Sequence, residues 1–309
     1  MVHNQRVPVI IDTDPGRDDA VALMLACGAP GLDIRAVTTV AGNVPLQKTT
    51  RNALRVLTLT GHTQIPVAAG AEKPLYRELV TAEHVHGEGG MAGPDLPEPG
   101  FEPEKRDAVS LMADVLEASE EPVTLVPIGP LTNVATLLDR RPELKEKVSR
   151  VVLMGGSVGA GNTTAAAEFN IYVDPEAARD VFASGLPVTM VGLDVTHQAR
   201  AGEEVMERLR SMGEIGETAA TLLAEPEWMP RSGERPPVHD AVAVAAALEP
   251  ELLRTLPMRV EVECDGEHTT GETVCDANGV SGREPNAEVG VGVDAGRVFE
   301  ILLDSIERL

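Results

Sequence analysis

Four aspartates crowd into one short segment of this chain. Asp12, Asp14, Asp18 and Asp19 lie within eight residues, directly after the apolar run at 7–11. Carboxylates at this spacing raise one another's pKa and repel at neutral pH, so a stable fold needs a cation or dense hydrogen bonding to hold them. Oxygen ligands favour a hard ion, Ca²⁺ or Mg²⁺, and the sequence offers no clustered Cys/His alternative. The segment therefore predicts a metal-dependent hydrolase site, because an acidic helix cap would explain only one or two of the four aspartates.

Three further polar groups interrupt apolar segments of the sequence. They are Asn43, which follows an apolar run; Asn162, Glu168 and Asn170, which follow Gly155 and Gly156; and His239 with Asp240, which precede the apolar run at 241–248. Amide and carboxylate side chains of this kind bind sugar hydroxyls. Asp240 is a candidate to join the metal, and His239 to donate a proton, because imidazole titrates near neutral pH. Each group also has an ordinary interpretation as a turn, an exposed loop or a helix cap.

Short apolar runs alternate with segments of helical periodicity from residue 7 to about residue 249, which predicts an α/β fold with an open, mostly parallel sheet and helices on both faces. The predicted strands are 7–11, 34–40, 123–128, 151–154 and 188–191. The predicted helices are 18–27, 47–60, 107–118, 131–139, 175–184 and 239–248. In such sheets ligands bind beyond the carboxyl ends of the strands, which is where the aspartates and Asn43 are expected.

The last part of the chain has a different pattern. Apolar and polar residues alternate within 257–275, which predicts an antiparallel ribbon, and a final helix is expected near 295–307. The sheet is therefore expected to be mixed. Because no linker or repeat interrupts the chain and 43% of its residues are hydrophobic, we expect residues 1–309 to form a single domain.

The composition limits the partners and the location of the protein. The formal net charge of −23 argues against nucleic acid or anionic membranes as partners. The chain has no apolar signal region and no segment of membrane-spanning length, so a cytoplasmic location is expected. The three cysteines lack C-x-x-C spacing and are expected to be reduced, although a bridge between Cys264 and Cys275 across the ribbon is an alternative.

Taken in chain order, six motifs resemble those of the inosine-uridine type nucleoside hydrolases. They are Asp12-Thr13-Asp14-Pro15-Gly16-Arg17-Asp18-Asp19-Ala20, Gly42-Asn43, Gly129-Pro130-Leu131-Thr132-Asn133, Val152-Leu153-Met154-Gly155-Gly156, Glu168-Phe169-Asn170 and His239-Asp240. The resemblance runs from about residue 7 to residue 250. It implies hydrolysis of the N-glycosidic bond of a ribonucleoside to ribose and a free base, with one Ca²⁺ ion.

The resemblance also implies a role for each matching residue. It gives the metal ligands as Asp14, Asp19, Asp240 and the main-chain carbonyl of Ile128, a position at which the family often has Thr. It gives the ligands of the ribose 2′- and 3′-hydroxyls as Asp18, Asn43 and Asn170, and those of the 5′-hydroxyl as Asn162 and Glu168. Asp14 would take a proton from the attacking water, and His239 would protonate the leaving base. A homodimer or homotetramer is common among such proteins.

Two alternatives to this function come from the same residues. Ile11-Asp12-Thr13-Asp14 also resembles the Asp-x-Asp motif of haloacid-dehalogenase-like, Mg²⁺-dependent phosphatases, but that scheme leaves Asp18 and Asp19 without a role. The second alternative is a protein that binds a nucleoside or ribose without turning it over.

Base preference is less clearly marked in the sequence. The chain has one tryptophan, Trp228, so a sandwich of two tryptophans around a purine is excluded, and broad or inosine/uridine-type specificity is expected. Trp228 is expected either to pack on a base or to anchor a loop. The glycine-rich segment at 84–90, which contains His84 and His86, is interpreted as a mobile flap or a disordered surface.

Overall fold

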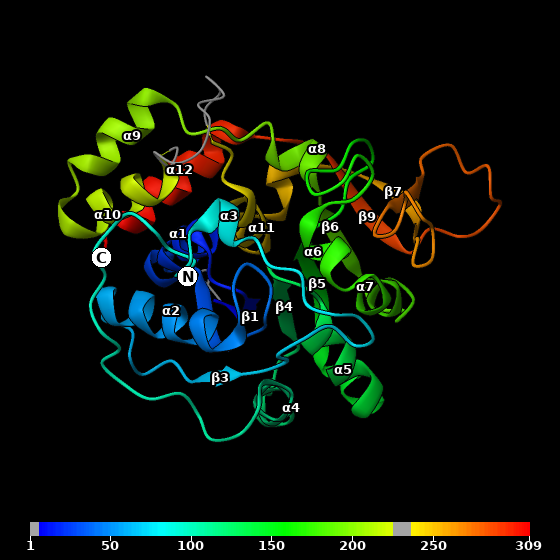
Figure 1. Cartoon of the computed structure of the whole chain (residues 1–309), viewed down its shortest axis with the longest axis horizontal. Coiled ribbons are helices and arrows are strands. Elements are labelled where there is room, and N and C mark those ends of the chain that lie inside the picture. The colour runs from blue at the N-terminus through cyan, green and yellow to red at the C-terminus, as the bar shows by residue number, and fades with distance from the viewer. Residues whose placement is uncertain (1–5, 225–235) are drawn as a thin grey trace, which may run out of the picture.

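A nine-stranded sheet runs through the computed structural model, which describes residues 6–224 and 236–309 (Figure 1). The strand order is β3-β2-β1-β4-β5-β6-β9-β7-β8. The strands are β1 (Val7–Thr13), β2 (Leu32–Thr39), β3 (Val67–Ala69), β4 (Val123–Pro127), β5 (Val148–Met154), β6 (Val188–Val191), β7 (Leu253–Val262), β8 (Thr273–Asp276) and β9 (Ala287–Val293). The first six strands and β9 pair in parallel, whereas β7 pairs antiparallel with both β9 and β8. The prediction of a mostly parallel, mixed sheet is confirmed.

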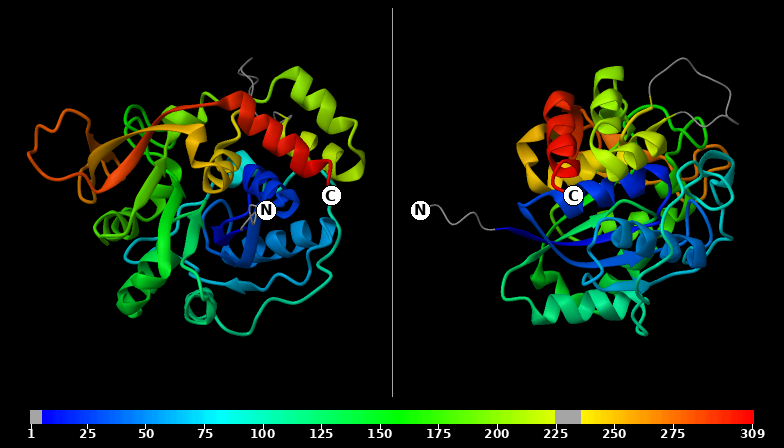
Figure 2. Two further views of the ribbon diagram at one scale, coloured as in Figure 1. Left: turned by 180° about the vertical axis from the view of Figure 1, so that it is seen from behind. Right: turned by 90° about the vertical axis from the view of Figure 1, so that its left-hand side faces the viewer.

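Helices cover both faces of this sheet (Figure 2). They are α1 (Arg17–Gly28), α2 (Leu46–Leu59), α3 (Glu83–His86), α4 (Ala108–Ala118), α5 (Thr132–Arg140), α6 (Phe169–Val173), α7 (Pro175–Phe182), α8 (Leu193–Thr196), α9 (Glu203–Arg210), α10 (Gly213–Leu223), α11 (His239–Leu248) and α12 (Ala295–Ile306), with 3-10 turns at Pro142–Lys147 and Pro250–Leu252. None of the helices in the described ranges combines the length and the apolar character needed to cross a lipid bilayer.

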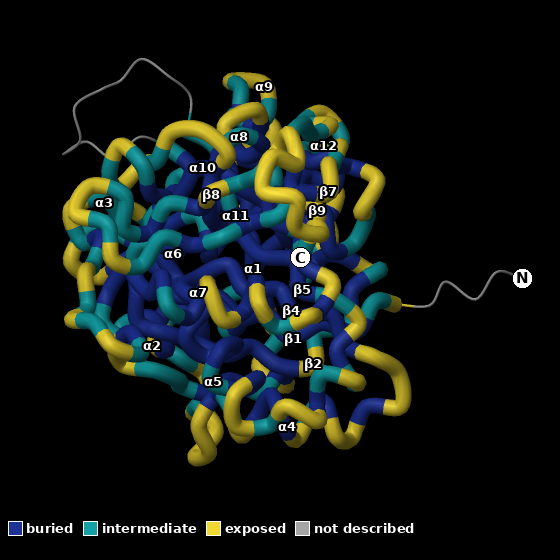
Figure 3. The backbone as a smooth tube through the Cα atoms, turned by 90° about the vertical axis from the view of Figure 1, so that its right-hand side faces the viewer, coloured by how far each residue is buried: buried dark blue, intermediate teal, exposed yellow. Residues whose placement is uncertain are grey.

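The central strand β1 has apolar side chains on both faces. Val9 and Ile11 belong to the core that contains α1, α11 and α12, whereas Ile10 belongs to the core under α4, α5 and α7. This division follows from the alternation of side chains along a strand, and burial on both faces explains why β1 is a continuous apolar run. Figure 3 shows the result, with buried backbone through the centre and exposed segments around the rim.

Local sequence sets the starts of several helices. Asp174 accepts a hydrogen bond from the main-chain N–H of Ala177 at 3.1 Å, and Pro175 occupies the first turn of α7. Asp294 accepts from the N–H of Arg297 at 3.0 Å at the start of α12. These are favourable residues at a helix N-terminus, because an aspartate oxygen satisfies a free N–H group and proline lacks one.

All five predicted strands are present, and each predicted helix is present to within two residues of its expected ends. The predicted ribbon is the antiparallel pair of β7 and β8. Elements that were not predicted are β3, which has three residues, β9, which is interrupted by Gly290 and Gly292, the helices α9 and α10, the short helices α3, α6 and α8, and the two 3-10 turns. The alternative of a bridge between Cys264 and Cys275 is wrong, because Cys275 lies opposite Val260 and both cysteines are free.

Candidate functional site

The polar segments predicted to carry chemistry meet at one edge of the sheet. β1 lies between β2 and β4, and the pairing continues past its end, where the N–H of Val40 donates to Thr13 at 3.1 Å and that of Ile128 donates to Asp12 at 2.8 Å. The carboxyl ends of parallel strands meet at one edge, so the side chains that follow them converge. They line a cavity of about 450 Å³ together with the first residues of α11.

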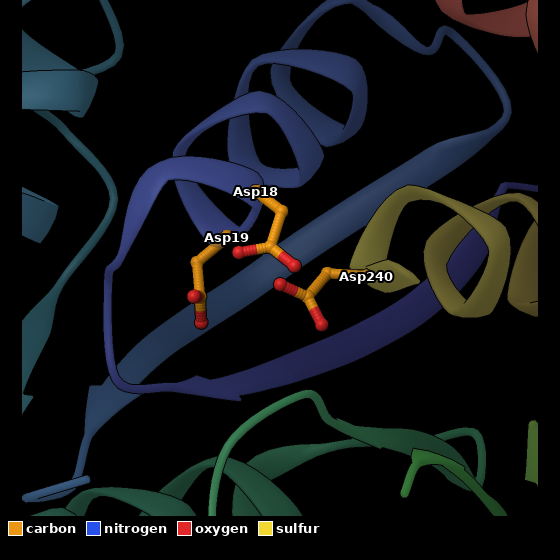
Figure 4. Close-up of side chains that lie close together, drawn as sticks. All are labelled: Asp18, Asp19 and Asp240. Atoms are coloured by element: carbon orange, nitrogen blue, oxygen red, sulfur yellow. The ribbon is translucent and has the colours of Figure 1, made fainter. Parts of the chain in front are cut away.

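Three carboxylates form an acidic cluster in this cavity (Figure 4). One oxygen from each of Asp18, Asp19 and Asp240 lies within 4.8 Å of the other two. Asp18 and Asp19 come from the first turn of α1, and Asp240 comes from the first turn of α11. Two helix N-termini therefore face the cluster, and their dipoles favour negative charge there.

The carboxylates of this cluster are costly to keep ionised. Burial raises the pKa of Asp240 well above its usual range, and the neighbouring carboxylates, Asp18 first, raise it further. The pKa of Asp19 is raised by burial and by Asp18. A bound divalent cation would offset both causes, because it replaces lost hydration and opposes the repulsion. The raised pKa values of Asp19 and Asp240 therefore fit a site that binds a hard metal ion through carboxylate oxygens.

Asp14 is fully buried and, unlike Asp18, Asp19 and Asp240, is not among the residues that line the cavity. Its Oδ2 accepts a hydrogen bond from the N–H of Asn43 at 2.6 Å, whereas its Oδ1 has no hydrogen-bond partner. Gly42 and Gly129 make room for this carboxylate, since a Cβ atom would lie 2.1 Å from Oδ2 at Gly42 and 2.5 Å from Oδ1 at Gly129. A buried carboxylate oxygen without a hydrogen bond destabilises the folded protein unless a cation or a proton binds to it.

Asp19 is the most firmly held of the aspartates. Its Oδ1 accepts from the hydroxyl of Thr13 at 2.7 Å, and its Oδ2 accepts from the N–H of Gly16 and the side-chain amide of Asn43, both at 3.0 Å. These bonds fix both the carboxylate and the turn before α1. Asn43 is thereby committed to two aspartates, because it also donates its main-chain N–H to Asp14.

Asn162, Glu168 and Asn170, three of the five predicted sugar-binding residues, line the same cavity as the acidic cluster. Asn170 donates its side-chain amide to the carbonyl oxygens of Ile128 at 3.0 Å and Met154 at 3.1 Å. The carbonyl predicted to bind the metal is therefore oriented by a residue predicted to bind ribose. Asn162 is exposed at the cavity rim, and its Oδ1 accepts from the N–H of Phe169 at 3.0 Å.

Glu168 is a buried carboxylate that lines the same cavity. It precedes α6 and accepts hydrogen bonds from the N–H groups of Gly156 and Asn170, both at 3.0 Å, and of Ile171 at 3.2 Å. Burial nevertheless raises its pKa to about 7, so loss of hydration outweighs the three hydrogen bonds. The group can accept or donate a hydrogen bond near neutral pH.

His239 lies on the cavity wall next to Asp240. Its Nδ1 is 2.8 Å from the hydroxyl oxygen of Thr196, and the ring of His197 packs edge-on with the ring centroids 5.5 Å apart. Burial lowers the pKa of His239 to about 3, and His197 and Arg200 lower it in the same direction. The imidazole is therefore neutral at neutral pH. A hydroxyl that donates to Nδ1 leaves the proton on Nε2.

Two features of the site differ from the sequence interpretation or were not predicted by it. The first residues of the glycine-rich segment 84–90 belong to the short helix α3, and His86 lines the cavity with its Nδ1 accepting from the N–H of Arg17 at 3.1 Å; the flap stays a prediction. Arg17 also lines the cavity, although nothing in its spacing marked it. Trp228 lies outside the described residues.

Comparisons with known proteins all match this chain to nucleoside hydrolases. The family model for the inosine-uridine preferring nucleoside hydrolases matches residues 9–300. The chain is 49% identical over 306 residues to the pyrimidine-specific ribonucleoside hydrolase RihA from Escherichia coli, covering 97% of this chain and 98% of the relative. It is 54% identical over 277 residues to the protein of the same name from Photobacterium profundum, covering 87% and 88% of the two chains.

Solved structures with the same fold include two enzymes whose names state a substrate preference. A purine-preferring ribonucleoside hydrolase from Gardnerella vaginalis matches with a TM-score of 0.90 and 32% identity, covering 97% of this chain and 98% of that one. An inosine-guanosine nucleoside hydrolase matches with a TM-score of 0.89 and 34% identity, covering 98% and 99%.

The raised pKa of Glu168 predicts a specific pH dependence of stability. In the metal-free protein this pKa, about 7, lies above the ordinary value of 4.5, so protonated Glu168 stabilises the fold below about pH 4.5 and this stabilisation is lost as pH rises through 7. We expect the thermal midpoint of the wild type to fall, relative to that of Glu168→Gln, between pH 4.5 and 7. A difference between the two proteins that stays constant over this interval would contradict the assignment.

Proposed function

This chain belongs to the inosine-uridine preferring nucleoside hydrolase family, and we propose that it cleaves pyrimidine ribonucleosides with one bound Ca²⁺ ion. The family assignment makes the protein a hydrolase that converts ribonucleosides to ribose and a free base, and it decides against the phosphatase and binding-protein alternatives. The observation that carries the proposal is the acidic cluster of Asp18, Asp19 and Asp240 in a cavity that also exposes sugar-binding side chains.

The proposed metal ligands are Asp14, Asp19, Asp240 and the main-chain carbonyl of Ile128. Support comes from the unpartnered Oδ1 of Asp14, from the raised pKa of Asp19 and Asp240, and from the hydrogen bond that orients Ile128. Oxygen donors of this kind favour Ca²⁺ over softer metals. When bound, Ca²⁺ supplies positive charge that lowers the pKa of a nearby water. Asp18 belongs to the same cluster, with a carboxylate oxygen within 4.8 Å of those of Asp19 and Asp240, and we propose that it contacts both the ion and the sugar.

The remaining polar side chains are proposed to hold the ribose. Asp18, Asn43 and Asn170 would bind the 2′- and 3′-hydroxyls, and Asn162 and Glu168 would bind the 5′-hydroxyl. These residues line the cavity on the side of the acidic cluster and of α6, so one sugar ring placed between them meets both sets. Hydroxyl contacts that strengthen as the ring flattens stabilise an oxocarbenium-like transition state, and the nearby carboxylates favour its positive charge.

Two residues are proposed to move protons. Asp14 would take the proton of the attacking water, and a cation bound beside it would keep its carboxylate ionised and able to act as a base. His239 would protonate the leaving base from Nε2, with Thr196 holding Nδ1. Before this step the imidazole must bind a second proton, because a neutral ring that lost its Nε2 proton would become imidazolate. Negative charge that develops on the leaving base favours the imidazolium form, whereas burial lowers the pKa of His239 to about 3 in the free protein.

The pyrimidine preference rests on the names of the relatives. Those at 49% and 54% identity are named pyrimidine-specific, whereas the solved structures named for purines share 32% and 34% identity. This preference is narrower than the broad or inosine/uridine-type specificity expected from the sequence. The cytoplasmic location and the homodimer or homotetramer stay predictions.

The proposal predicts metal-dependent ribose release. Purified protein should release ribose from uridine and cytidine faster than from inosine, and prolonged treatment with a strong Ca²⁺ chelator should abolish all three activities until Ca²⁺ is added back. Hydrolysis that persists in protein verified to be metal-free would contradict the metal role. Faster release from inosine than from uridine would contradict the pyrimidine preference alone.

The proton-donor role predicts a leaving-group dependence. His239→Ala should slow uridine hydrolysis by about 10²- to 10⁴-fold, as expected for loss of a general acid. It should slow a nitrophenyl riboside far less, because that leaving group needs no proton. His62→Ala, which removes an imidazole outside the cavity, is the control. Equal losses of His239→Ala on both substrates would exclude the role.

A further inference from the structure

Arg17 occupies an unusual position at the centre of the site. It stands between Gly16 and Asp18 in the aspartate segment, yet its side chain is directed away from the acidic cluster toward other elements. The residue is buried to 7% exposure, so little of its guanidinium group can donate to water. Its guanidinium instead donates to main-chain carbonyls, which is a use that needs the planar fork of arginine.

The carbonyls that Arg17 contacts belong to the end of α10. Nε donates to Leu222 at 3.0 Å, and Nη2 donates to Thr221 at 2.8 Å and to Ala224 at 2.7 Å. The last carbonyls of a helix lack partners within the helix and carry partial negative charge. α10 has no basic residue in its own last turn. Arg17, about 200 residues earlier in the chain, therefore supplies the cationic cap of this helix.

The same residue also holds the segment that contains α3. Its main-chain N–H donates to Nδ1 of His86, and its Nη1 donates to the carbonyl of Ala92. The N–H of Ala92 in turn donates to the carbonyl of His86 at 3.2 Å, so the contacts close into a ring. Arg17 thus ties three parts of the cavity wall together: the aspartate segment, the segment 86–92 and the end of α10.

The wall that Arg17 holds is the apolar one. Leu222, Leu223 and Ala224 line the cavity, as do Val80 and Ala82 near α3. The carboxylates and amides of the cavity come mainly from other segments, namely the start of α1, the loop at Asn43, the segment 162–170 and the start of α11. A nucleoside has a polar sugar and a flat, largely apolar base, so the base is expected against the apolar wall. Given the proposed function, we infer that Arg17 is a positioning residue that sets where the nucleobase binds and thereby which bases are accepted.

The test separates base placement from catalysis and from metal binding. Arg17→Met should raise KM for uridine about tenfold, the order expected when a preformed wall must be ordered on binding, with a smaller change in kcat. The ratio of kcat/KM for uridine to that for inosine should move toward one. Ca²⁺ affinity, measured calorimetrically, should be retained because the acidic cluster is intact.

Arg55→Met is the matched control. Arg55 also donates to main-chain carbonyls, those of Leu96 and Pro97, but it does not line the cavity. We expect this variant to lose stability while keeping the wild-type KM and base ratio. If Arg17→Met fails to fold, Arg17→Lys replaces it, because one ammonium group retains the charge but cannot reach all four carbonyls.

Each result of these kinetic and calorimetric measurements has its own interpretation. An unchanged KM and base ratio in the folded Arg17 variant overturns the inference. Equal losses in kcat for every substrate with reduced Ca²⁺ affinity also overturn it, since they indicate a general structural role. If the wild type hydrolyses no ribonucleoside, the proposed function itself has failed. If it prefers inosine, only the pyrimidine preference fails, and a change of the base ratio in the Arg17 variant still supports the inference.

Discussion

Repulsion between buried carboxylates is the constraint on which this structure depends. Asp14, Asp19 and Asp240 are nearly inaccessible to solvent, and for each of them burial and neighbouring carboxylates raise the pKa. A protein gains nothing in stability from such an arrangement, because each ionised group loses hydration and meets like charge. Buried carboxylates this close together destabilise the fold unless a cation binds them. Their unfavourable free energy therefore indicates a functional site rather than a structural one.

The rest of the edge is built to hold these groups apart from water and in place. Adjacent parallel strands bring their carboxyl ends together, Gly42 and Gly129 leave room for the Asp14 carboxylate, and Asn43 donates to two aspartates. Two helices begin at the cluster and contribute favourable dipoles. Arg17 donates to the carbonyls at the end of α10 and to the ring of His86, and these contacts hold apolar segments that line the cavity. The acidic cluster and the apolar segments that line the cavity are thus held by different contacts.

Much of the fold and of the acidic segment could be predicted from the sequence, because these features depend on residues that are close together in the chain. Apolar runs and helical periodicity defined the strands and helices that position the site, and crowded like charges marked the acidic segment. The short strand β3, the glycine-interrupted β9 and the pairing partners of β7 depend on contacts distant in sequence. The same is true of Arg17 and His86, whose roles arise from main-chain groups that any residue type could supply. All nine strands belong to one sheet. The single domain stays a prediction.

The most direct test of the account is a calorimetric titration of metal-free protein with Ca²⁺ at neutral pH, with Asp240→Asn measured alongside. The wild type should bind one equivalent and release protons, because carboxylates of raised pKa must lose them to bind an ion. The folded Asp240→Asn protein should bind at least tenfold more weakly, as expected for loss of a charged ligand. Absence of binding by the wild type, or equal affinity in the two proteins, would contradict the claim that these carboxylates form a metal site.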